Sequence, residues 1–367
     1  MKKQRRLVGI DLFRGLAIYC VVILHTDEGI EILPPAWSWI VQFSGFAVPF
    51  FLATAFYLTF SKLHESKGGF SLKERLMRLL VPYLFWSALY VAYKVLKYLV
   101  QSETDSISKL FHDPIGIIFL GKAAFQLYFL PLLILGTVLA KPVSLLIERK
   151  IKLNILILLA ILSLILYELI LISGNSFENG ASLAFQSLLN SIALTNLALQ
   201  NNQLLRIILV LIAWTIRCLP YIFVAAIASH PNVKVALSNY EKSYVYTILL
   251  VLLFLAINSF GGNLLPQSLY ELSRGYLALL SAIALSNYLP SNRTIANLSL
   301  CSFGIYLTHL LFVETFQILE KRLYSEELFR TSTLNLLMFA LLSFAVSWIV
   351  TDILMRKKSL AKLMFGV

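Results

Sequence analysis

Three polar side chains interrupt the first apolar segment of the chain, residues 8–26. Arg14 and His25 are eleven residues apart, close to three helical turns, so both lie on one face about 16 Å apart along the axis. Asp11 precedes Arg14 by three residues and can pair with it. An imidazole exchanges protons at neutral pH, and a guanidinium binds phosphate or carboxylate. This stripe is expected to face a protein interior or a water-filled cavity. The alternative is an interfacial Asp11–Arg14 ion pair, with His25 at the helix end.

Further charged and polar side chains lie inside apolar segments later in the chain. Glu271 precedes Arg274 by three residues, so this pair can neutralise itself. Arg217 has no local partner of opposite charge, which predicts a partner elsewhere in the bundle or a place lining a cavity. Tyr306 and His309 are also three residues apart and share a helix face. His309 is interpreted as a polar contact in a pore or, preferably, as a core histidine with satisfied hydrogen bonds.

The composition indicates that an integral membrane protein holds these side chains. Hydrophobic residues make up 59% of the chain and charged residues 14%, against about 25% charged in soluble domains. Apolar runs of spanning length recur from end to end, and no polar block is long enough to fold alone. The prediction is an all-α, polytopic bundle of about ten transmembrane helices, forming one domain over residues 1–367. The expected spans are 8–26, 39–61, 76–100, 126–147, 152–173, 207–229, 244–260, 268–289, 299–320 and 334–355.

The distribution of Lys and Arg predicts the orientation of this bundle. With ten spans, twenty Lys and Arg residues fall on the side of the N-terminus and six on the opposite side. Positively charged loops stay in the cytoplasm, so both termini are expected there, in a multi-pass protein of the inner cell membrane. The net charge of +12 is attributed to this bias and not to nucleic-acid binding. Residues 180–200 are expected to form an outer loop or an interfacial helix, because Gln186, Asn190 and Asn196 disfavour a span.

The cysteines and histidines form no disulfide or metal-ligand pattern. Cys20, Cys218 and Cys301 all lie in apolar segments and are interpreted as packing residues. The five histidines lack metal-ligand spacing, so no metal is expected. A glycine-rich phosphate-binding motif is also absent from the sequence.

Four motifs, in order, resemble those of the acyltransferase 3 family of integral membrane acyltransferases. The segment IDLFRGLAIYCVVILHT carries the family's arginine and histidine separated by ten residues, here Arg14 and His25. KERLMRLLVPYLFWS resembles the basic, proline-containing entry to its third helix, and LYFLPLLILG resembles its aromatic-Leu-Pro helix. SFGIYLTHLLF resembles its late Tyr-Leu-x-His segment. The resemblance spans residue 9 to about residue 355, but the second helix, PFFLATAFYLTF, lacks the Ser-Gly usual in the family, so no substrate is identified.

The resemblance implies transfer of an acyl group, commonly acetyl, from cytoplasmic acyl-CoA to a hydroxyl or amino group of a cell-envelope glycan or lipid-linked acceptor. His25 is the candidate general base, because attack on the thioester requires removal of the acceptor proton. Arg14, at the donor end of the same stripe, is the candidate to bind CoA phosphate or the thioester arm. A carboxylate is expected to orient the imidazole, and Glu314 is the candidate since it lies at a similar outer depth. Alternatively, Glu314 is an interfacial acid without this role.

A cationic cluster at the expected cytoplasmic mouth of the third helix offers a second contact for the donor. Lys73, Arg75 and Arg78 either hold the anionic nucleotide part of CoA or only follow the positive-inside bias.

A carrier or channel that moves substrate or protons past the buried Arg and His residues fits the same composition, although no internal repeat is evident. A non-catalytic membrane partner protein is a third interpretation. For the enzyme, the expected partners are acyl-CoA, the acceptor and the lipid bilayer.

Overall fold

The computed structural model describes residues 6–65, 71–178, 182–193, 202–238, 243–323 and 332–367. Within these ranges every regular element is a helix, so the predicted all-α class is confirmed. The contacts divide the chain into two compact units, each described by itself. The first unit holds Met1–Leu58 and Ala228–Lys357, and the second holds Thr59–Ile227 and Lys358–Val367. The chain passes from one unit to the other within helices α3 (Ala47–Glu65) and α11 (Gln203–Ala228).

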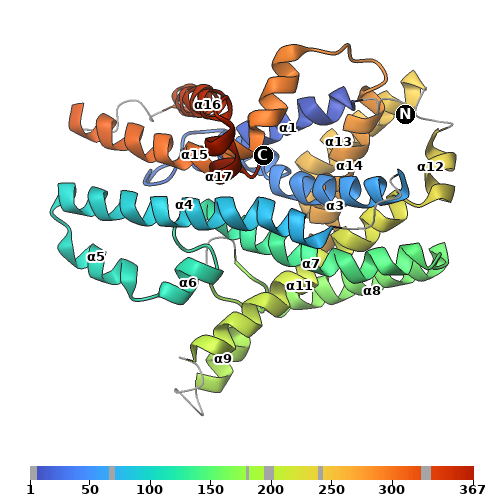
Figure 1. The fold of residues 1–367 in the computed structure, drawn as a ribbon, viewed down its shortest axis with the longest axis horizontal. Helices are drawn as coiled ribbons and strands as arrows, with labels where there is room; N and C mark the ends of the chain where they lie inside the picture. The colour runs from blue at the N-terminus through green and yellow to red at the C-terminus, as the bar shows by residue number, and fades with distance from the viewer. Residues whose placement is uncertain (1–5, 66–70, 179–181, 194–201, 239–242, 324–331) are drawn as a thin grey trace. The chain divides into compact units, whose positions relative to one another are not determined.

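The first unit is built around its N-terminal helix (Figure 1). Its helices are α1 (Val8–Ile23), α2 (Trp37–Ser44), the first part of α3, α12 (Pro231–Ser238), α13 (Tyr244–Phe260), η2 (Gly261–Asn263), α14 (Gln267–Leu285), α15 (Arg293–Leu323) and α16 (Thr333–Met355). Helix α1 packs against α2, α14, α15 and α16, and α13 packs on α14. Two glycines of α1 permit this close packing. A Cβ on Gly9 would lie 2.0 Å from the Ala282 carbonyl oxygen of α14, and one on Gly15 would lie 2.6 Å from Leu298 of α15.

The second unit is organised around one long helix, α4 (Leu72–Gln101) (Figure 1). Its other elements are α5 (Thr104–Phe111), α6 (Pro114–Phe119), η1 (Phe125–Tyr128), α7 (Phe129–Glu148), α8 (Leu153–Ile172), α9 (Gln186–Ala193), most of α11 and α17 (Lys358–Phe365). Helix α4 packs on α7 and on the C-terminal helix α17. The indole of Trp86 donates a 2.8 Å hydrogen bond to the Met364 carbonyl of α17. The Tyr83 hydroxyl donates to the Ile118 carbonyl and accepts from Gly121 N, which ties α6 to α4.

Eight helical segments of the described ranges are long and apolar enough to cross a membrane. They are Trp37–Leu63, Leu72–Val100, Phe125–Glu148, Leu153–Ile172, Gln203–Ala228, Tyr244–Asn263, Arg293–Arg322 and Thr333–Met355. The expected spans 8–26 and 268–289 correspond to α1 and α14, which fall outside this set. Helix α1 has only 16 residues and ends before His25, and α14 has Glu271 and Arg274 in its first half. A multi-pass membrane bundle is therefore supported, with eight candidate spans among the described residues. Crossing of the membrane by α1 and α14 stays a prediction.

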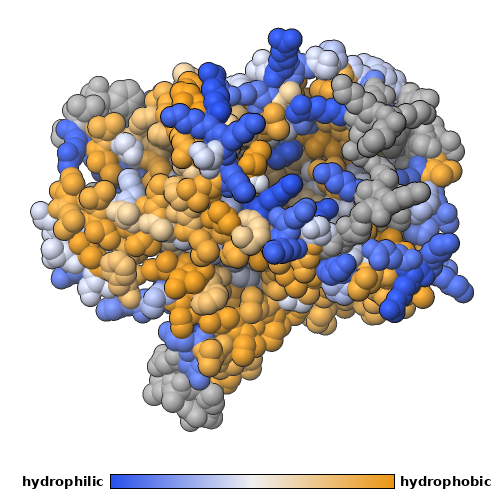
Figure 2. All heavy atoms as spheres, viewed as in Figure 1, coloured by the Kyte–Doolittle hydropathy of each residue, from blue (hydrophilic) through white to orange (hydrophobic). Residues whose placement is uncertain are grey.

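The exposed face of α8 is apolar, as contact with lipid requires. Leu158, Ile161, Leu162, Ile165 and Leu169 are all exposed on this helix. A soluble protein rarely leaves so continuous an apolar stripe in water. Figure 2 likewise shows apolar residues over much of the surface drawn.

Part of the ambiguous stretch 180–200 is described. Helix α9 has eight residues, which is too short to span a bilayer and is compatible with an outer loop or interfacial position. Residues 194–200 lie outside the described residues.

Candidate active site

His25 stands immediately after the last turn of α1. The backbone N–H of His25 donates to the Val22 carbonyl, and Thr26 N donates to the Ile23 carbonyl. Both hydrogen bonds run from residue i to residue i−3, so tighter turns follow the last α-helical turn. The Thr26 hydroxyl also donates to Ile23 O at 2.8 Å. The imidazole is buried, with 6% of the residue exposed. A histidine that sequence spacing placed at the end of the helix is thus held inside the first unit.

A carboxylate three residues downstream holds the His25 ring. Glu28 Oε1 lies 3.0 Å from His25 Nδ1. Because a carboxylate accepts, Nδ1 carries the hydrogen, and Nε2 is the basic nitrogen of the neutral ring. The Glu28 side chain is 46% exposed, and its backbone carbonyl accepts from Gln317 Nε2 of α15 at 3.3 Å. Sequence reasoning missed Glu28, although an acid three residues after the histidine was the available signal.

A second histidine contacts the first. The ring centroids of His25 and His309 lie 5.3 Å apart, with the planes tilted by 42°. His309 is fully buried on α15, and its Nδ1 lies 2.8 Å from the Tyr306 carbonyl and 3.1 Å from the Ile305 carbonyl. Nδ1 therefore donates, and Nε2 is an acceptor that has no hydrogen-bond partner among the described residues. The sequence predicted a core histidine with satisfied hydrogen bonds, and the structure satisfies them at Nδ1 of His309 but not at Nε2.

The neighbours of His309 on α15 include two more of the predicted residues. The Tyr306 ring lies 6.2 Å from the His309 ring and 6.3 Å from Phe303, which forms a row of stacked and tilted rings. Glu314 is half-buried five residues beyond His309. Its proposed action on His25 stays a prediction. The carboxylate that hydrogen-bonds His25 Nδ1 in the structure belongs to Glu28.

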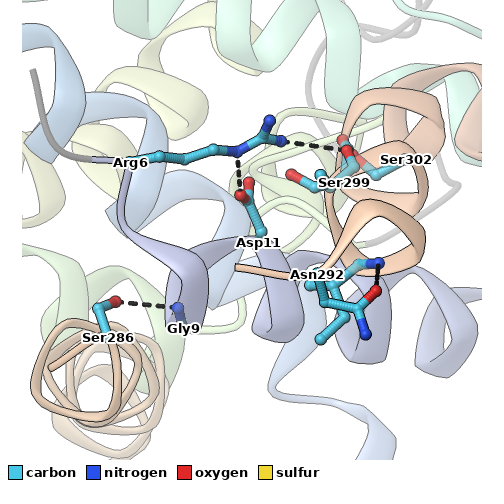
Figure 3. A network of polar contacts seen from close by, with 9 residues as sticks. Arg6, Gly9, Asp11, Ser286, Asn292, Ser299 and Ser302 are labelled. Carbon is cyan, nitrogen blue, oxygen red and sulfur yellow. Dashed lines mark hydrogen bonds and ion pairs between the residues drawn. The ribbon is translucent and has the colours of Figure 1, made fainter. Parts of the chain in front are cut away.

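The charges near the start of α1 are arranged differently from the expected local pair. Arg6 Nε donates to Asp11 Oδ2, and Arg6 Nη2 donates to the Ala296 carbonyl at 3.1 Å (Figure 3). Asp11 therefore hydrogen-bonds Arg6 and not Arg14. Arg14 is half-buried and makes no hydrogen bond or salt bridge to any residue that the structure describes, although the charges of Asp11 and Arg6 act on it. Such a guanidinium is suited to an anionic ligand.

Arg274 contacts an aromatic ring one turn away on α14. Its Cζ lies 4.7 Å from the ring centroid of Tyr270, a cation–π contact, and Nη1 lies 3.4 Å from the Tyr270 hydroxyl. That hydroxyl donates to the Asn258 carbonyl at 3.0 Å. Gln267 Nε2 donates a hydrogen bond to Glu271 Oε1 at 3.4 Å. Arg274 is therefore held by an aromatic ring one turn away.

The remaining predicted cations belong to the second unit. Lys73 and Arg78 are exposed on the first turns of α4, and Arg75 donates a 2.7 Å hydrogen bond to the Thr59 hydroxyl. Arg217 is buried in the middle of α11, with 7% of the residue exposed. The cluster of Lys73, Arg75 and Arg78 is thus an accessible cationic surface, whereas Arg217 lies in the core of its unit.

The chemistry available at His25 is proton transfer. A buried imidazole with Nδ1 fixed by a carboxylate presents Nε2 as a base, as in catalytic triads. No group of three or more His, Cys, Asp or Glu side chains that could hold a metal ion occurs in the described part of the chain.

Comparison with known proteins assigns the chain to a family. The sequence profile of the acyltransferase 3 family, described as an acyltransferase domain, matches residues 7–352. No curated protein and no solved structure matches the chain significantly. The matched region contains α1, α15 and both contacting histidines. The chain therefore belongs to the acyltransferase 3 family and is a membrane acyltransferase.

Proposed function

We propose that this enzyme transfers an acyl group, acetyl in the first instance, from acyl-CoA to a hydroxyl or amino group of a cell-envelope glycan or lipid-linked acceptor. Family membership supports the acyl transfer itself. The single observation that carries the mechanism is the buried His25 imidazole, with Glu28 on Nδ1 and the His309 ring beside it. His25 is the general base in this proposal.

The reaction needs one proton transfer in each direction. His25 Nε2 removes the proton of the acceptor hydroxyl or amine as its oxygen or nitrogen attacks the thioester carbonyl. A new ester or amide bond forms, the carbon–sulfur bond breaks, and the imidazolium returns the proton to the departing thiolate of CoA. Glu28 favours the imidazolium and keeps the ring in one orientation. Glu314, on α15, is the second candidate for this orienting role.

The two substrates approach from opposite sides of the membrane in this proposal. The twenty-to-six bias of Lys and Arg supports cytoplasmic termini in a multi-pass protein of the inner cell membrane. Helix α1 then enters from the cytoplasm, so Arg14 lies in the donor half and His25 in the acceptor half. Arg14 contacts a phosphate or the thioester arm of the donor, and Lys73, Arg75 and Arg78 add attraction for its nucleotide part.

Labelled acetyl-CoA tests the reaction. Purified protein is added to membranes from the native host, which hold the acceptor whatever its identity, and label is followed into the envelope fraction together with release of free CoA. The proposal expects stoichiometric label transfer and CoA release. Intact acetyl-CoA in the presence of these membranes, with protein that is folded and inserted, would contradict it.

A further inference from the structure

A cavity of about 400 Å³ lies in the first unit, where the start of α1 meets the end of α14 and the start of α15. Its volume falls in the range of small-molecule sites. The polar residues lining it are Arg6, Asp11, Ser286, Ser291, Asn292 and Arg293. Figure 3 shows the Arg6 side chain crossing from the start of α1 to the first turns of α15, beside Asp11. None of these residues has a role in the proton transfer at His25.

One wall of the cavity is fixed by a direct link between two helices. Gly9 N donates to the Ser286 hydroxyl at 2.9 Å, and that hydroxyl donates to the Ala282 carbonyl at 2.8 Å (Figure 3). The hydroxyl therefore joins the first turn of α1 to the last turns of α14. Any side chain on Gly9 would collide with the Ala282 carbonyl, so this contact requires glycine. The cavity is thus bounded by helices held in a defined position.

The opposite wall is the N-terminal turn of α15. Asn292 caps it, because its side-chain oxygen accepts from Thr294 N at 2.8 Å and from Ile295 N at 3.2 Å. Asn292, Arg293 and Ala296 all line the cavity. Helix α15 is 31 residues long, and the partial positive charge of its dipole is concentrated at this end.

The charges around the cavity leave a positive excess. Asp11 is the one acid of the lining, and its carboxylate is paired with Arg6. Arg293 and the N-terminal end of α15 remain as positive groups. Arg14 lies one turn beyond Asp11 on α1 and interacts electrostatically with Asp11 and Arg6. Arginine side chains around a concave polar site are suited to phosphate, which they bind through paired hydrogen bonds.

We propose that this cavity binds a phosphate group of the acyl donor, with Arg293 and Arg6 as its contacts. The inference rests on the proposed use of acyl-CoA. It adds a site on the same helix as Arg14 and His25, so that a donor anchored here directs its flexible thioester arm along α1 toward the base. The cluster formed by Lys73, Arg75 and Arg78 belongs to the other unit.

Binding measurements on the full chain in phosphatidylcholine nanodiscs test the site without any acceptor. The probes are CoA, dephospho-CoA, pantetheine and inorganic phosphate. The variants are Arg293→Gln, Arg6→Gln and Arg6→Lys, with Arg356→Gln as the matched control. Arg356 is an exposed arginine of the same unit that pairs with Asp352. The expected result is CoA affinity weakened about tenfold by Arg293→Gln, unchanged by the control, and pantetheine affinity unchanged in all variants.

Arg6 also pairs with Asp11, so Arg6→Gln alone would be an insufficient test if that substitution disturbed folding. Arg6→Lys keeps the positive charge but removes the bidentate guanidinium. The inference is overturned if Arg293→Gln and both Arg6 variants bind CoA as tightly as Arg356→Gln does. It is also overturned if inorganic phosphate binds as tightly as CoA, or if phosphatidylglycerol in the nanodiscs displaces CoA, because the site would then serve a free anion or a lipid headgroup. Failure of the wild-type protein to bind CoA at all would instead contradict the proposed donor itself.

Discussion

The imidazole rings of His25 and His309 are in direct contact, with their centroids 5.3 Å apart, although one follows α1 and the other lies in the middle of α15. In each ring Nδ1 contacts an oxygen acceptor, Glu28 for His25 and two carbonyls for His309. Both rings therefore offer Nε2 as an acceptor in their neutral form. Two such acceptors cannot hydrogen-bond each other.

His309 is expected to act on the acceptor substrate through Nε2. A buried acceptor without a partner is costly, so a substrate hydroxyl or amine that donates to it gains affinity. His309→Leu should lower acyl transfer by about 10-fold or more, mainly through the acceptor KM, while His309→Gln, which keeps an acceptor oxygen, should recover part of it. Steady-state transfer in native membranes measures both. Equal loss in the two variants, or no change in KM, would show a packing role only.

Glu28 is expected to matter more than Glu314 for orienting His25. Loss of the carboxylate charge that orients the imidazole of a Ser-His-Asp triad lowers kcat by about 10⁴-fold, so Glu28→Gln should lower kcat by up to about that factor while the affinity for acetyl-CoA is retained. Glu314→Gln should have the smaller effect, because the recorded hydrogen bond to His25 Nδ1 comes from Glu28. Single-turnover rates of the two variants compare them directly. A larger loss in Glu314→Gln would assign the orienting role to that residue.

The polar stripe of Arg14 and His25 stays a prediction that rests on helical periodicity. The spacing of Arg14 and His25 is a local property, and the all-α class follows from apolar runs. Contacts between distant segments were beyond this reasoning. Asp11 was expected to pair with Arg14 three residues later, yet Arg6 reaches it from outside the helix, where no periodicity applies. The contact between His25 and His309 depends on α1 packing against α15, which the spacing within either helix does not encode.

One expected span shows a related limit. Residues 8–26 are apolar over a spanning length, but the helix ends at Ile23, and the chain turns so that His25 is buried beside α15. Apolar composition alone does not determine where such a helix ends.

The connection between α5 and α6 should be held by an ion-pair network. Asp113 accepts two hydrogen bonds from Arg206, at 2.6 and 2.8 Å, and one each from Lys122 and Gly116 N. Burial alone would raise the pKa of Asp113, but the hydrogen bonds from Arg206, Gly116 N and Lys122 outweigh it and hold that pKa below its usual value. Asp113→Asn leaves Arg206 nearly buried without its carboxylate and should destabilise the protein by roughly 3 kcal/mol.

The pH dependence of this loss follows from the sign of the shift. A lowered pKa contributes stability that is fully present above the ordinary value of about 3.9 and disappears only as the pH falls through the folded value. The difference in unfolding temperature between wild type and Asp113→Asn should therefore be the same at pH 5 and pH 8. The control is Asp105→Asn, at an exposed position of α5, and it should change neither value. A difference that shrinks between pH 8 and pH 5 would contradict this assignment.

The cationic cluster of Lys73, Arg75 and Arg78 should assist donor binding through long-range attraction. Replacing all three by Gln is expected to raise the KM for acetyl-CoA several-fold at low salt, and the effect should vanish at high salt. Because Arg75 also bonds Thr59, the double Lys73→Gln, Arg78→Gln variant separates attraction from packing. The matched control is Lys357→Gln with Lys358→Gln, both at exposed positions. A KM unchanged at low salt would leave the cluster with a topological role only.

The turnover of His25→Ala tests the central claim, that His25 is the general base, most directly. Labelled acetyl transfer and acetyl-CoA binding are measured together for this variant and for His112→Ala, which removes an exposed histidine of the second unit. Loss of a general base costs about 10²–10⁴-fold in rate, so His25→Ala should lose nearly all transfer while binding acetyl-CoA normally, and His112→Ala should match wild type. Wild-type turnover in a correctly inserted His25→Ala protein would contradict the claim.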